Sequence, residues 1–137
     1  MNQATYRRVC ALSVVGLLAA CGAAATAQVQ PSAGMLRWPA VSKDKICFSY
    51  ANDLWLVSKN GGMGSPLSSP AGSESFARFS PDGQTLAFIG SYEGGRDVYA
   101  MPVNGGAATR VTYHPAGETV AGWTPDGKIL FMSNGLA

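Results

Sequence analysis

The stretch Phe76–Gly90, FARFSPDGQTLAFIG, joins two alternating apolar runs through Ser-Pro-Asp-Gly. Alternation of this kind predicts two strands, each buried on one face. Proline presets φ at the second turn position, aspartate tolerates the third, and glycine supplies the left-handed conformation that closes a bulged hairpin. We therefore predict that Pro81, Asp82 and Gly83 form the structural turn of a β-hairpin. Nearly the same phrase, VAGWTPDGKILFMSN, returns at residues 120–134.

The second copy belongs to an internal repeat with an offset of 44 residues, which places Pro125, Asp126 and Gly127 in the same structural turn. The same offset relates DLWLV at residues 53–57 to DVYAM at 97–101, and NGG at 60–62 to NGG at 104–106. The Asn-Gly-Gly blocks predict primed turns, in which positive φ is required. A period of about 40 to 45 residues with several short strands per unit is typical of β-propellers.

The predicted fold class is all-β, made of β-propeller blades with four antiparallel strands each. The complete unit should hold strands at about 75–80, 85–91, 97–102 and 108–113. We predict a partial propeller over residues 35–137, with blades at 35–72 and 73–115 and a half blade at 116–137. Propellers have typically four to eight blades. About two and a half blades cannot close a ring, so we expect either a fragment of a longer protein or a truncated gene product.

The N-terminal segment has the features of a secretory signal. MNQATYRR ends in two arginines, and a short apolar core follows at residues 9–20. A basic start, a short apolar core and small residues after it are typical of exported proteins. We predict a signal peptide over residues 1–27 and a linker over 28–34. The expected location is the periplasm or, through a lipid anchor, a bacterial membrane.

Two cleavage sites remain open. LAAC, ending at Cys21, resembles a bacterial lipobox, in which lipid is attached to the cysteine and cleavage occurs before it. ATA at residues 25–27 would instead release a soluble protein that starts at Gln28. We favour lipidation of Cys21 over soluble secretion.

Charge gives no indication of a nucleic-acid partner. The chain has 10 Lys and Arg against 8 Asp and Glu, and two of the basic residues, Arg7 and Arg8, lie in the predicted signal. The rest is balanced and has no charge run, whereas a phosphate-binding surface needs clustered cations.

No catalytic residue, metal site or cofactor site is predicted within the chain. His114 is the single histidine and stands just before a proline, which favours a structural role in a loop between blades. No Gly-x-Ser-x-Gly motif is present, and too few ligands remain for zinc. Cys47, in the strand-like KICFSY, is predicted to be a small buried apolar residue. The equivalence of Asp53 and Asp97 favours a repeated structural role.

The order of these blocks resembles a known family. FSPDGQTLAFIGSYEGGRDVYAMPVNGGAATRVTYHP is similar to the propeller repeats of TolB-like proteins. The region from MLRWPAVSKDKICFSYANDLWLVS to RVTYHPAGETVAGWTPDGKILFMSN is even more similar to the opening of tricorn-type serine proteases. That resemblance implies a large peptidase with an N-terminal propeller, a second propeller, a PDZ-like domain and a C-terminal serine peptidase core. None of the catalytic residues of such a core matches a position in this chain.

Three interpretations follow. The chain is the N-terminal propeller piece of an exported tricorn-like serine peptidase, a substrate-access scaffold that is inactive alone. Alternatively, it belongs to a non-enzymatic TolB-like periplasmic propeller that binds protein partners, or it is a truncated product without function. The expected partners are peptides or proteins and the remainder of a protease chain, with membrane contact only through a lipid anchor.

Overall fold

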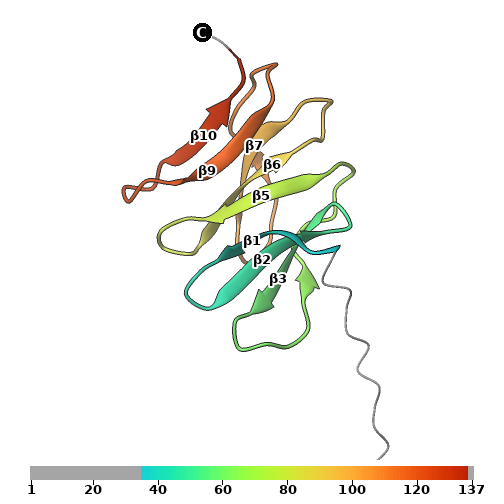
Figure 1. The fold of residues 1–137 in the computed structure, drawn as a ribbon, viewed down its shortest axis with the longest axis vertical. Coiled ribbons are helices and arrows are strands. Elements are labelled where there is room, and N and C mark those ends of the chain that lie inside the picture. The colour runs from blue at the N-terminus through green and yellow to red at the C-terminus, as the bar shows by residue number, and fades with distance from the viewer. Residues whose placement is uncertain (1–34, 136–137) are drawn as a thin grey trace, which may run out of the picture.

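The computed structural model describes residues 35–135, and its regular elements are ten β-strands (Figure 1). The strands are β1 (Arg37–Val41), β2 (Lys45–Tyr50), β3 (Asp53–Ser58), β4 (Ser65–Pro66), β5 (Glu74–Phe79), β6 (Thr85–Gly90), β7 (Asp97–Pro102), β8 (Thr109–Arg110), β9 (Glu118–Trp123) and β10 (Ile129–Ser133). Among these residues no helix is long and apolar enough to span a bilayer.

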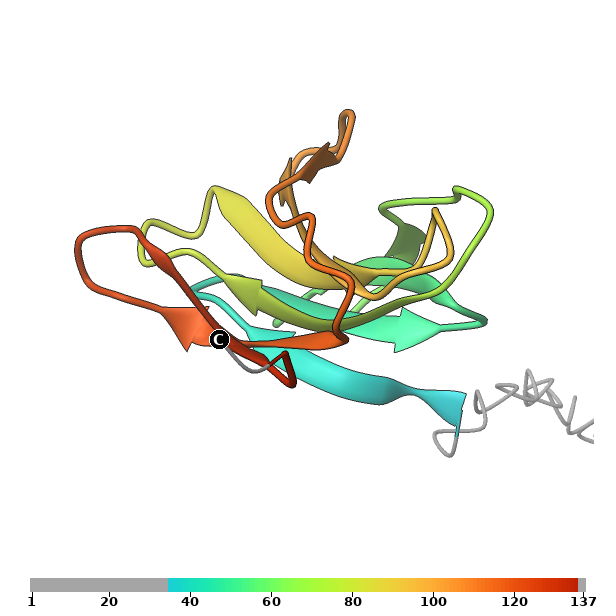
Figure 2. The same cartoon turned by 90° about the horizontal axis from the view of Figure 1, so that it is seen from above.

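The strands form three antiparallel sheets in chain order. The first sheet is β1-β2-β3-β4, the second is β5-β6-β7-β8, and the third contains β9 and β10. In Figure 1, β5 lies between β1 and β9, and both neighbours contact it. Seen from above, β4 and β8 spread away from these first strands (Figure 2). The prediction of incomplete, unclosed propeller blades is confirmed.

The fourth strand is shorter than predicted. Residues 108–113 were expected to be extended, but β8 comprises only Thr109 and Arg110. The chain then leaves the regular ladder, because the Thr112 hydroxyl oxygen accepts the Val98 N–H at 2.8 Å. The Val111 N–H still donates to the Val98 carbonyl. A side chain thus takes the place of a main-chain partner at the end of the strand.

The Asn-Gly-Gly connections are not primed turns. Gly61 N–H donates to the Ser58 carbonyl, and Gly105 N–H donates to the Pro102 carbonyl. The central residues of these turns are therefore 59–60 and 103–104, and none of them has a positive φ. The positive φ falls on the closing glycines, with +89° at both Gly61 and Gly105. The prediction of a primed turn was wrong, because the hairpin closes one residue earlier than we assumed.

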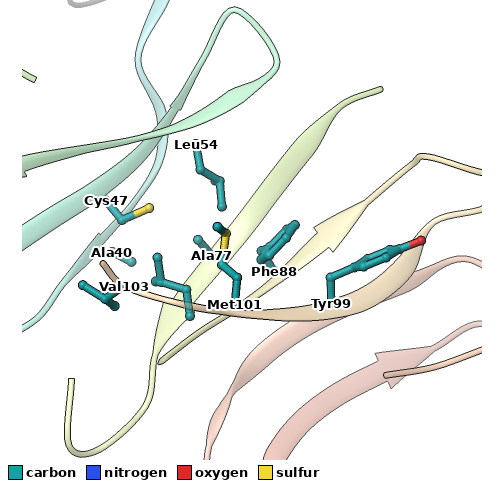
Figure 3. Close-up of a cluster of buried hydrophobic side chains, with 9 residues drawn as sticks. Ala40, Cys47, Leu54, Ala77, Phe88, Tyr99, Met101 and Val103 are labelled. Carbon is teal, nitrogen blue, oxygen red and sulfur yellow. The ribbon is translucent and has the colours of Figure 1, made fainter. Parts of the chain in front are cut away.

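The first two sheets pack face to face around an apolar core. Cys47 and Leu54 of the first sheet lie opposite Phe88, Tyr99 and Met101 of the second (Figure 3). The strands alternate, so the opposite face of the second sheet carries its own set of apolar residues. That face packs on the third sheet through Ala87, Ile89, Val98 and Val120.

The outer face of the first sheet has no such cover among the described residues. Its apolar side chains surround a hollow of about 470 Å³. We call this surface the open face; its residues are Met35, Leu36, Phe48, Tyr50, Trp55 and Val57. Phe48 and Trp55 are paired across β2 and β3, as Phe88 and Tyr99 are paired across β6 and β7. The open face is therefore equivalent to the face that the second sheet buries against the first.

Candidate functional site: the interface between sheets

The predicted lipidation residue, Cys21, lies outside the described residues, as do the predicted signal peptide (1–27) and the linker (28–34). The six predicted turn residues lie inside them. They form the connections from β5 to β6 and from β9 to β10, at the ends of the hairpins.

The turn after β5 is held by Asp82. Its Oδ1 accepts the Ser80 hydroxyl at 2.5 Å and the Gln84 N–H at 3.0 Å. These hydrogen bonds lower the pKa of Asp82 below its usual value. The Gly83 N–H donates to the Ser80 carbonyl, and Gly83 has a φ of +71°, which a residue with a Cβ rarely adopts.

The turn after β9 is one residue shorter, because the Thr124 N–H donates to the Lys128 carbonyl, whereas the Ser80 N–H donates to the Thr85 carbonyl. Its side-chain contacts also differ. Gly127, with a φ of +84°, donates to the Thr124 carbonyl. The Asp126 carboxylate pairs with the Lys128 ammonium at 2.8 Å, and this ion pair is the main cause of its lowered pKa. The Thr124 hydroxyl accepts the Lys128 N–H. Pro81 and Pro125 lie exposed at the two turns, which leaves both hairpin ends facing solvent.

His114 is exposed, and its Nδ1 accepts the Ala116 N–H at 3.1 Å. Within residues 35–135, no hydrogen bond joins it to a serine or cysteine. His114 thus lies in the connection between β8 and β9, where its described hydrogen bond is local to the loop. The same part of the chain contains no group of three or more His, Cys, Asp or Glu side chains that could hold a metal ion.

Cys47 is fully buried in the first core. Burial, followed by the negative charge of Glu74, raises the pKa of its thiol to about 12. Because the thiolate is the nucleophile, a thiol that stays protonated is chemically inert. Cys47 therefore packs as a small apolar residue, as the sequence predicts.

Of the two equivalent aspartates, Asp97 forms an ion pair among the described residues and Asp53 does not. Asp97 is 1% exposed and its Oδ2 accepts from Arg110 at 2.8 Å. In the first sheet, the residue equivalent to Arg110 is Pro66, 44 positions earlier, and proline has no charged group to pair with Asp53. Asp53 has no salt bridge in the described part of the chain, so the expected common role does not extend to this contact.

Sequence reasoning missed Glu74, which is 1% exposed at the start of β5. Its Oε2 accepts the Leu54 N–H at 2.9 Å and also the Ser68 hydroxyl. Its Oε1 accepts the Tyr92 hydroxyl, and burial together with this contact raises the pKa of Tyr92. Both carboxylate oxygens thus bind groups of the protein itself.

A cavity of about 500 Å³ lies beside this carboxylate, between the outer parts of the first and second sheets. Glu74 and Tyr92 provide its polar wall, and Leu67 and Met101 are among its apolar lining residues. Because the polar groups already bind one another, the arrangement serves cohesion between sheets better than it serves ligand chemistry.

A profile described as the tricorn protease N-terminal β-propeller domain matches residues 33–137. The chain belongs to this family. A search of curated proteins finds no match to the chain.

Solved structures agree with this assignment. A tricorn protease structure is 30% identical to the chain and superposes with a TM-score of 0.62 over 71% of it. A putative TolB from Agrobacterium tumefaciens is 23% identical, with a TM-score of 0.61 over 72% of the chain. TolB from Acinetobacter baumannii is 20% identical, with a TM-score of 0.62 over 72%.

The chain spans 10% of the tricorn protease chain, 38% of the first TolB and 26% of the second. The two TolB structures, at their low identity, show the shared fold. The tricorn protease structure adds a sequence relationship, in agreement with the family profile.

Proposed function

We propose that this chain is the N-terminal propeller portion of an exported, tricorn-like serine peptidase, where it acts as a substrate-access scaffold without catalytic residues of its own. The observation that carries the proposal is the family match over residues 33–137, which covers all the described sheets. The arrangement of the first strands supports the scaffold role. β1, β5 and β9 each form one edge of their sheet, and β5 contacts both of the others. The three edge strands therefore form one continuous surface.

The access role can be tested in the whole peptidase. Arg37 and Arg78 are the basic residues of β1 and β5. If the first strands line the passage for peptides, Arg37→Glu with Arg78→Glu should lower kcat/KM for long acidic peptides through repulsion. Cleavage of a short neutral peptide should stay unchanged. Equal effects on both substrates, or none on either, would remove the access role.

A TolB-like propeller that binds protein partners is the second candidate, and it rests on the structural similarity to the two TolB proteins. The coding sequence after Ala137 separates the candidates. A continuing frame with a PDZ-like domain and a peptidase core supports the first proposal. Repeats that close a ring and then end support the second, and a stop codon directly after Ala137 would contradict both.

Export and lipidation at Cys21 are also part of the proposal. They are supported by LAAC after a basic, apolar start. Mass spectrometry of the mature N-terminus should find a lipid-modified Cys21. An unmodified terminus at Gln28 would show soluble secretion instead, and an intact Met1 would show that the segment is not a signal.

A further inference from the structure

Two buried glutamates occupy the same place in successive sheets. Glu74 begins β5 and Glu118 begins β9, and they are 1% and 2% exposed. They are separated by the repeat offset of 44 residues. Ionisable side chains are seldom fully buried without a partner, so a burial that recurs at the same place requires a common explanation.

Both carboxylates reach back to the preceding sheet, where each accepts from a main-chain amide and from a hydroxyl. Glu74 accepts the Leu54 N–H at 2.9 Å, and Glu118 accepts the Val98 N–H at 3.3 Å. The second contact is a hydroxyl, from Ser68 to Glu74 and from Thr112 to Glu118. The amide precedes its hydroxyl by 14 residues and its carboxylate by 20 in both cases.

The amide is available because the fourth strand is short. In the first sheet, β4 pairs only with Trp55 and Leu56 of β3. The Leu54 N–H therefore donates to the Ser68 hydroxyl oxygen, at 3.1 Å, and to the glutamate of the next sheet. A buried main-chain donor without a partner is costly. The amide therefore has two acceptors, a hydroxyl of its own sheet and the carboxylate of the following sheet, and the carboxylate joins the two sheets at this point.

The main chain contributes to the same contact. The Glu74 N–H donates to the Asn52 carbonyl at 2.7 Å, and the Glu118 N–H donates to the Arg96 carbonyl at 3.2 Å. Each glutamate is thus fixed at its backbone and at its side chain to residues that flank the start of the preceding third strand. Two separate attachment points define both the position and the direction of the incoming strand.

We propose that Glu74 and Glu118 form a repeated docking joint between blades. The amide and the hydroxyl of one sheet make a receptor, and the partner that fits it is a sheet whose first strand begins with glutamate. The joint fixes the register of each new sheet on the one before it. This inference does not depend on export or on peptidase function.

The first sheet provides a natural contrast. Arg37 pairs with Ser49 as Ser75 pairs with Ile89, so Leu36 holds the position of Glu74. Leu36 is 40% exposed at the rim of the open face. The open face therefore offers apolar contact without this carboxylate, and a surface that covers it must do so without the glutamate joint.

The test is amide hydrogen exchange of the full 137-residue chain, followed residue by residue by NMR. Glu74→Leu keeps the volume and removes the acceptors, so the Leu54 amide should exchange at least about tenfold faster, while Val57 in the same strand changes much less. Glu74→Gln should stay within about threefold of the parent, because its carbonyl can accept from Leu54 and its amide can donate to Tyr92. Glu118→Leu should act in the same way on Val98.

Two controls isolate the joint. Glu93→Gln removes the charge of an exposed glutamate, and Leu36→Glu adds a glutamate where no described sheet precedes it; neither should change exchange at Leu54 or Val98. If Glu74→Leu fails to fold, Ser68→Ala tests the same receptor and should speed exchange of Leu54 alone. Unchanged Leu54 and Val98 exchange in the Leu and Ala variants would overturn the proposal. So would equal acceleration in Glu74→Leu and Glu74→Gln, because the acceptor would then not be the cause.

Discussion

The second and third sheets begin with closely similar hairpins and end in different environments. In β6, residues 86–89 are at most 1% exposed. In β10, Leu130 is 48% exposed, Phe131 43% and Met132 61%. Both hairpins have a Pro-Asp-Gly turn and an apolar second strand, so local sequence does not explain the difference. Burial in this architecture comes from the neighbours: among the described residues, the second sheet is covered on both faces and the third on one, and β10 has no further strand beside it.

This comparison has a thermodynamic consequence. In repeat architectures, stability is approximately the sum of the intrinsic stability of each unit and the contacts with its neighbours. The second sheet has both kinds of contact, whereas β10 pairs with β9 alone among the described strands. We therefore expect the third sheet to open more readily than the second, and similar substitutions in the two sheets to have unequal effects.

Phe88 and Phe131 provide the largest expected difference. Leu86 faces Phe79 as Ile129 faces Trp123, so the two phenylalanines, each two residues further on, hold equivalent positions. Phe88→Ala should reduce the free energy of unfolding by about 3–5 kcal/mol, because it leaves a cavity in the first core. Phe131→Ala should cost about 1 kcal/mol or less, because that side chain is already partly in water. Denaturant unfolding measures both, and equal losses would mean that β10 is covered in solution.

A substitution at Trp123 tests how the third sheet is attached to the second, and its expected effect is of intermediate size. Its indole Nε1–H donates to the Arg78 carbonyl of β5 at 2.9 Å. Trp123→Phe keeps an aromatic ring, as at the equivalent Phe79, and removes this hydrogen bond at a cost of about 1 kcal/mol. Amide exchange in β9 should become faster by a few-fold, while β6 keeps its protection. The matched variant Phe79→Trp should not protect β9, and acceleration spread evenly over both sheets would contradict a local role.

Much of this fold could be predicted from the sequence, because its strongest signals are local. Pro-Asp-Gly fixes the hairpins, and alternation assigns the apolar faces. The shortened β8 could not be predicted, because it depends on the Thr112 hydroxyl taking a main-chain partner's place. The exposure of Phe131 also depends on packing between sheets rather than on the strand itself.

The glutamates lie between these cases. Their spacing of 44 residues was visible in the sequence, as was that of Ser68 and Thr112. What the sequence does not show is that these residues meet an amide of the preceding sheet. Exposed surface is the usual place for glutamate, so composition alone favours the wrong environment for Glu74.

The smallest expected effect concerns the two turn aspartates and their dependence on pH. Both have a lowered pKa in the folded chain. A lowered folded value means that each carboxylate adds stability above its unfolded pKa of about 3.9, and that this contribution is lost as pH falls through the lower folded value. The unfolding midpoint should therefore fall in acid, and it should fall less in Asp82→Asn and Asp126→Asn.

Salt should separate the two turns. The main cause of the Asp82 shift is the Ser80 hydroxyl, followed by the Gln84 N–H, and hydrogen bonds at contact distance are little affected by ions. The main cause at Asp126 is the exposed Lys128 ammonium, whose attraction is screened. High salt should therefore move the pKa of Asp126 towards its ordinary value and leave that of Asp82 nearly unchanged. Carboxyl NMR titrations at low and high salt measure both pKa values. Lys128→Gln should reproduce the salt effect at Asp126 in low salt. The second cause of the lowered Asp126 pKa is a hydrogen bond with the Thr124 side chain, and a pKa that stays low in Lys128→Gln would assign the shift to this contact.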